Sequence, residues 1–119
     1  MPERTILVMA SHPLIGRLLV DFARGAGYAA DELDTGESPD AAITRVDPSV
    51  VLVDYRRADA VSAGVRQRLE ERAIPGVLFS GALDRADMEI TAGFLRWSSF
   101  VMPISQQELA SVLERSERR

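Results

Sequence analysis

Short apolar runs alternate with amphipathic stretches along the chain, and this alternation limits the possible folds more than any other feature. The run Ser49–Asp54 is mostly β-branched and is bounded by turn residues, which is typical of a strand buried on both faces. Similar runs occur at 6–10, 29–33, 76–81 and 100–103. Apolar residues at helical spacing follow each run, so the pattern predicts five strands and five helices.

Each predicted helix has a local signal for its start or its end. Pro13 suits a first helical turn, and Asp84 suits the N-cap of the fourth helix. Ser105, followed three residues later by Glu108, forms a capping box for the last helix. The apolar residues expected to face the core are Leu14, Ile15, Leu18, Leu19, Phe22 and Ala26; Val61, Val65 and Leu69; Ile90, Phe94 and Trp97; and Leu109, Val112 and Leu113.

Regular alternation of strands and helices with short connections predicts one α/β domain over residues 1–119. Such a chain forms a doubly wound parallel sheet with right-handed crossovers and helices on both faces. Ligands of these sheets bind outside the carboxyl ends of the strands. The residues just after each strand are therefore the first candidates for a functional site.

Composition excludes several classes of function. The net charge of −4 gives no general basic surface for nucleic acid. Because the chain has no cysteine and one histidine, it cannot build a zinc site or a disulfide framework. The first apolar run is too short for a signal peptide or a membrane span. We therefore expect a cytoplasmic protein that binds neither nucleic acid nor a membrane.

The residues at the strand ends resemble those of a known family. A strand before His12-Pro13, a strand ending in Asp54, a strand ending in Ser80-Gly81 and a short strand ending in Pro103 together resemble the receiver domain of bacterial response regulators. The resemblance covers nearly the whole chain. It implies a flavodoxin-like, CheY-like (βα)5 fold and a place in phosphorelay, or two-component, signalling.

The resemblance also assigns a role to individual positions. It implies that Asp54 is the phosphoacceptor, that Ser80 is the switch hydroxyl, and that Pro103 is the proline that follows a phosphate-binding lysine. The family's acidic pair, which holds magnesium with the phosphoacceptor, falls on Ala10 and Ser11. The lysine falls on Met102, and the aromatic switch position falls near Ser99, with Phe100 beside it.

These departures weaken the expected phosphorylation chemistry. Magnesium is usually held by one or two carboxylates together with water and phosphate oxygens, so Asp54 alone makes a poor site. We therefore expect no resident cofactor and weak or absent Mg²⁺ binding. Arg56 or Arg57 could fold back onto Asp54 and supply the missing positive charge, or both could be exposed on a loop. Asp54 itself could have the purely structural role of accepting backbone N–H groups.

The leading hypothesis is a degenerate, or pseudo-receiver, domain without enzyme activity that works as a phosphorylation-independent protein-interaction module. The expected partner is a histidine kinase, an output domain or a second copy of the chain. Trp97, Ser99 and Phe100 are the candidate partner surface, although Trp97 also fits core packing. One alternative is a receiver still phosphorylated on Asp54, and another is a small serine hydrolase using Ser11 or Ser80. A Gly-x-Gly-x-x-Ala match at 25–30 ends a helix, which argues against a dinucleotide site.

Overall fold

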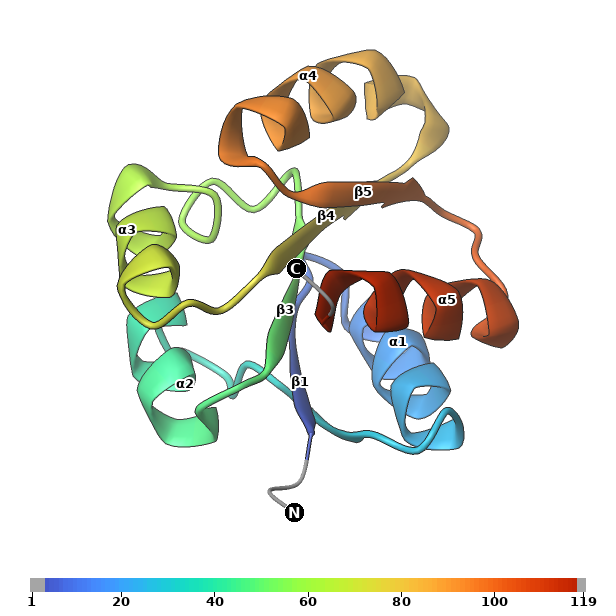
Figure 1. Ribbon diagram of the computed structural model, residues 1–119, viewed down its shortest axis with the longest axis horizontal. Helices are drawn as coiled ribbons and strands as arrows, with labels where there is room; N and C mark the ends of the chain where they lie inside the picture. The colour runs from blue at the N-terminus through green and yellow to red at the C-terminus, as the bar shows by residue number, and fades with distance from the viewer. Residues whose placement is uncertain (1–3, 118–119) are drawn as a thin grey trace.

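The computed structural model describes residues 4–117 as a five-stranded parallel sheet with helices on both faces (Figure 1). The strand order is β2-β1-β3-β4-β5, which confirms the predicted flavodoxin-like architecture. The strands are β1 (Thr5–Met9), β2 (Ala29–Glu32), β3 (Val50–Asp54), β4 (Gly76–Ser80) and β5 (Ser98–Val101). The helices are α1 (Pro13–Gly25), α2 (Pro39–Val46), α3 (Ala63–Glu71), α4 (Arg85–Leu95) and α5 (Gln106–Glu117), with a 3₁₀ turn, η1 (Ala82–Asp84), before α4.

Alternate residues of the strands point to opposite faces of the sheet and fill two separate cores. Val50 and Leu52 of β3 face α1 and α5, whereas Val51 and Val53 face the helices α2, α3 and α4. Figure 1 shows these two groups of helices on opposite sides of the central strands. Residues 50–54 and 76–80 are buried throughout, as expected for the two inner strands β3 and β4.

Most of the predicted helix signals are confirmed. Ser105 and Glu108 form the reciprocal capping box, with the Glu108 N–H donating to the Ser105 hydroxyl at 3.1 Å and the Ser105 N–H donating to the Glu108 carboxylate at 3.3 Å. The Nδ1 of His12 accepts the N–H of Leu14 at 3.1 Å, so the histidine shapes the entry to α1. Within residues 4–117, no helix combines the length and apolar character needed to cross a bilayer.

The predicted inner faces of α1 and α4 are partly wrong. Ile90 and Phe94 were expected in the core but are 61% and 83% exposed, and Leu14 is 74% exposed. The residues that actually pack α4 onto the sheet are Met88 and Ala92. In α1 the buried residues are Gly16, Leu19, Val20 and Ala23.

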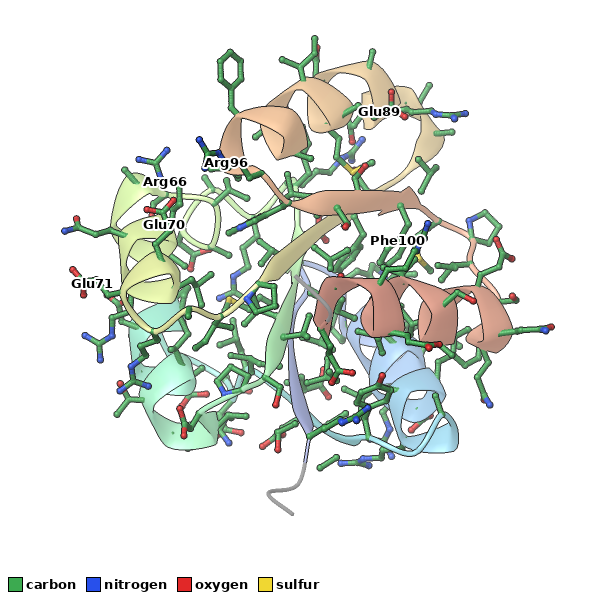
Figure 2. The ribbon with its side chains drawn as sticks, viewed as in Figure 1. Arg66, Glu70, Glu71, Glu89, Arg96 and Phe100 are labelled. Atoms are coloured by element: carbon green, nitrogen blue, oxygen red, sulfur yellow. The ribbon has the colours of Figure 1, made fainter. Side chains whose placement is uncertain are left out.

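Trp97 and Phe100 both pack against the sheet. The Trp97 indole lies directly over the backbone of Gly76, where any Cβ would overlap the ring. Phe100 is 8% exposed and stacks on Phe79 with ring centroids 5.5 Å apart. Figure 2 shows Phe100 between β5 and α5. Phe100 is therefore a core residue and not part of an exposed partner surface as predicted. Trp97 is half-buried.

The contact between Gly76 and Trp97 predicts an unusually costly glycine substitution. Gly76→Ala places a methyl group against the indole, so we expect a loss of about 1–3 kcal/mol in the free energy of unfolding, measured by urea denaturation. In a Trp97→Ala background the same substitution should cost much less. Gly93→Ala is the matched control, because Gly93 is helical with open space around it, and it should stabilise the protein by about 0.5–1 kcal/mol. An equal cost of Gly76→Ala in both backgrounds would contradict this account.

Candidate functional site

Asp54 ends β3 and is the buried carboxylate around which the strand-end loops are organised. It is 7% exposed. Its Oδ2 accepts the N–H of Ser11 at 3.0 Å and the Ser11 hydroxyl at 2.6 Å. Its Oδ1 accepts the N–H of Arg56 at 2.9 Å. A buried carboxylate with three short donors is well satisfied, which fits the structural role considered from the sequence.

The loop after β1 offers hydrogen-bond donors where a metal site needs anions. Ala10 contributes a methyl group, and both the N–H and the hydroxyl of Ser11 donate to Asp54. Magnesium requires oxygen ligands with lone pairs free to coordinate it. Two hydrogen-bond donors already occupy Oδ2 of Asp54. Among residues 4–117, no group of three or more His, Cys, Asp or Glu side chains is placed to hold a metal ion. This donor set does not fit a magnesium ion.

The two arginines after Asp54 direct their guanidinium groups to other carboxylates. Arg56 Nε donates to Asp84 Oδ2 at 2.6 Å. Arg57 Nε donates to Asp59 at 2.8 Å, and its Nη1 donates to the Ala10 carbonyl at 3.2 Å. A guanidinium folded back onto Asp54 is therefore not the arrangement seen here, although the charge of Asp54, after the hydrogen bond and charge of Asp84, still contributes to raising the pKa of Arg56. Arg56 instead holds Asp54 through its backbone N–H.

A second polar cluster, which joins Arg56, Ser80 and Asp84, was not predicted. The Ser80 hydroxyl donates to Asp84 Oδ2 at 2.8 Å, on the same oxygen that Arg56 binds. Val77 and Phe79 face α1 and α5, and Ser80 follows as the last residue of β4. The Arg56 guanidinium, and then the Ser80 hydroxyl, hold the pKa of Asp84 below its usual value. The sequence showed Asp84 only as a helix cap, yet its side chain makes no capping bond.

A small pocket lies beside Asp54. Its volume is about 260 Å³, and it is lined by Ile15, Asp54, Arg56, Phe79, Ser80, Gly81 and Met102. Met102 packs against the core that faces α1 and α5, and its N–H donates to the Ser80 carbonyl at 2.8 Å. The Met102–Pro103 peptide bond is cis. Where the resemblance implies a lysine, the pocket therefore has an apolar thioether wall.

The geometry of a serine hydrolase is not assembled here. The Ser11 hydroxyl donates to Asp54 and the Ser80 hydroxyl donates to Asp84. The Nδ1 of His12 accepts a backbone N–H from its own helix. Each serine proton therefore goes to a carboxylate, and the histidine is a helix cap, so the nucleophile–base pair that such an enzyme needs is missing from the described part of the chain.

Trp97, the other candidate partner residue, lies at a hollow between α3 and the end of α4. The hollow has a volume of about 620 Å³ and includes Phe94, Trp97 and the charged residues Arg66, Glu70 and Arg96. Figure 2 shows these three charged side chains close together at the outer side of α3 and α4. Ser99 is half-buried on β5. The partner roles of Trp97 and Ser99 stay predictions.

Comparison with known proteins supports the fold. No protein-family model matches the sequence, and no curated protein matches it. Among solved structures, NtrX from Brucella abortus superimposes with a TM-score of 0.78 at 20% identity, covering 98% of this chain and 27% of NtrX. The chemotaxis protein CheY4 from Vibrio cholerae gives a TM-score of 0.77 at 16% identity and covers 97% of this chain and 99% of CheY4.

A third similar structure is the N-terminal receiver domain of a two-component response regulator from Bacteroides fragilis. Its TM-score is 0.80 at 16% identity, and the alignment covers 99% of both chains. The chain therefore has the fold of response regulator receiver domains. It spans about a quarter of the length of the NtrX chain that it matches.

The Arg56–Asp84–Ser80 cluster predicts a specific dependence of stability on pH. Because the pKa of Asp84 is lowered in the folded state, its contribution is present above the unfolded value of about 3.9 and is lost as the pH falls through the folded value. We expect wild type to be more stable than Asp84→Asn near neutral pH, with the difference disappearing in strong acid. Urea denaturation across this pH range measures it.

Asp87→Asn is the control for this experiment, since Asp87 lies in the first turn of α4, three residues after Asp84, but outside the cluster. The difference between wild type and this variant should not follow the same pH profile. A difference between wild type and Asp84→Asn that stays constant down to strong acid would contradict the ion pair.

Proposed function

We propose that this domain is a receiver-type protein-interaction module in two-component signalling and that it works without phosphorylation. The observation that carries the proposal is the hydrogen bonding of Asp54, whose carboxylate is held by Ser11 and by the Arg56 N–H. The receiver fold supports the signalling class. The side chains around Asp54 support independence from phosphate.

Phosphoryl transfer depends on groups that neutralise the developing charge. Removing one such group typically lowers the rate by a factor of about 10² to 10³. At this site Ala10 and Ser11 stand in place of the carboxylates that would anchor a metal, and Met102 stands in place of a lysine. The Ser80 hydroxyl, which would contact a phosphoryl group, already donates to Asp84. All these changes disfavour phosphorylation of Asp54.

An interaction role also fits the surface of the domain. Large apolar side chains are exposed on two helices and on the turn before α4, and they are Leu14, Leu18, Leu83, Ile90 and Phe94. Exposed apolar side chains that cluster on a helix often mark a contact with another protein. We infer that the partner is a protein, either a histidine kinase, an output domain or a second copy of this chain.

A titration with magnesium and beryllofluoride, a mimic of a phosphoryl group, tests this function. We expect no saturable change in the amide NMR signals of Asp54, Ser80 and Met102 at low millimolar magnesium, because the site lacks the anions that anchor the ion. A receiver domain with a complete acidic pair is the positive control. Saturable shifts around Asp54 would overturn the proposal and favour a receiver that is phosphorylated on this residue.

Restoring the acidic pair should create magnesium binding. In Ala10→Asp/Ser11→Asp, carboxylates lie beside Asp54, so the variant should be destabilised without a divalent cation because like charges repel. Magnesium at about ten to a hundred times its dissociation constant should then raise the free energy of unfolding by about 1–3 kcal/mol. Thermal denaturation with and without magnesium measures this. Wild type is the control and should not respond, and an equal response in both proteins would contradict the proposed cause.

A further inference from the structure

The pocket beside Asp54 has the size and lining for one side chain of another molecule. Its volume of about 260 Å³ lies below the range of about 300–1,000 Å³ typical of pockets that hold whole small molecules. Ile15, Phe79 and Met102 form apolar walls that continue into the core. Asp54, whose carboxylate is buried, lines this largely apolar space together with Arg56 and Ser80.

Asp54 retains one free acceptor position. A carboxylate offers about four lone-pair sites. Two donors occupy Oδ2, but among the donors of residues 4–117 Oδ1 accepts only the Arg56 N–H. The three donors are two backbone N–H groups and a hydroxyl, and the nearby guanidinium groups of Arg56 and Arg57 bind Asp84 and Asp59 instead. A buried anion held only by neutral donors favours a ligand that brings a positive charge and an N–H donor.

An apolar pocket with a carboxylate in its lining matches the chemistry of an alkylammonium group. Lysine carries a compact ammonium on a flexible four-carbon stem, whereas the guanidinium of arginine is a broad plane. The stem would pack against Ile15, Phe79 and Met102, and the ammonium would donate to Oδ1 of Asp54. We propose that this pocket binds a lysine side chain of a protein partner, an inference that rests on the proposed interaction function.

Exposed apolar side chains next to the pocket in sequence favour a protein as the source of the lysine. Leu14, next to the lining residue Ile15 on α1, is 74% exposed, and Leu83, two residues after the lining residue Gly81, is 95% exposed. A partner surface that inserts a lysine would cover both of them, whereas a free amine would leave them in water.

The lysine comes from outside these 119 residues. All 14 basic residues of this sequence are arginines, so a second copy of these 119 residues has no lysine to insert. The absence of lysine also simplifies the test, because amine probes compete with no lysine side chain of the domain itself.

Titration of the ¹³C,¹⁵N-labelled chain with n-butylammonium, without magnesium or a phosphate analogue, tests the site. We expect saturable shifts of the Asp54, Arg56 and Gly81 amides and of the Met102 methyl group. n-Butanol, which has the same stem without the charge, should give no saturable shift. Asp54→Asn keeps the acceptor oxygen but removes the charge, and it should weaken binding by about tenfold or more.

Met102→Lys provides a second variant, in which Asp54 itself is not substituted. It places an ammonium of the chain itself in the pocket and should abolish binding of n-butylammonium, whereas Met102→Leu, its control, should retain it. The absence of saturable shifts in wild type, or equal binding of n-butanol, overturns the proposal. Because this titration contains no magnesium or beryllofluoride, its failure is distinguishable from failure of the interaction function.

The tripeptide acetyl-Leu-Lys-Leu-amide distinguishes a protein partner from a free amine. We expect it to bind several-fold more tightly than n-butylammonium, and Leu14→Ser/Leu83→Ser should remove this advantage while leaving n-butylammonium binding unchanged. Equal or weaker binding of the tripeptide would overturn the protein source and assign the pocket to a free amine.

Discussion

The hydrogen bonds to Asp54 hold together the loops at the carboxyl end of the sheet. A buried carboxylate is costly unless its oxygens find donors, so the segments after β1 and β3 must present their N–H groups to it. Ser11 does so from one segment and Arg56 from the other. The position of the pocket, and the directions of the side chains around it, follow from this requirement.

The sheet could be predicted from the sequence because its signal is local. The inner strands are unbroken apolar runs, and a residue of such a strand faces one side or the other by simple alternation. That alternation places Asp54 on the side of α1 and α5 and Ser80 on the side of α4. The strand ends therefore identified the candidate residues, and Asp54 and Ser80 both line the pocket at this edge of the sheet, but the bond from Ser80 to Asp84 depends on the tertiary fold.

Helix faces were harder to predict because two apolar stripes have the same period. On α4, Ile90 and Phe94 are the larger side chains, yet Met88 and Ala92 lie inward. Which of the two stripes is buried depends on how the helix packs on the sheet, and this packing is a property of the whole fold. The same limit applies to Asp84, whose partner Arg56 lies 28 residues away in the sequence. No local pattern could distinguish that ion pair from a helix cap.

Arg56 links the two polar clusters, one through its backbone and the other through its side chain. Its backbone N–H binds Asp54, and its side chain binds Asp84, which in turn accepts the Ser80 hydroxyl. A lysine bound as proposed would share Oδ1 of Asp54 with the Arg56 N–H. Asp84 directly precedes α4, so Arg56 connects the carboxylate at the end of β3 to the turn that leads into this helix.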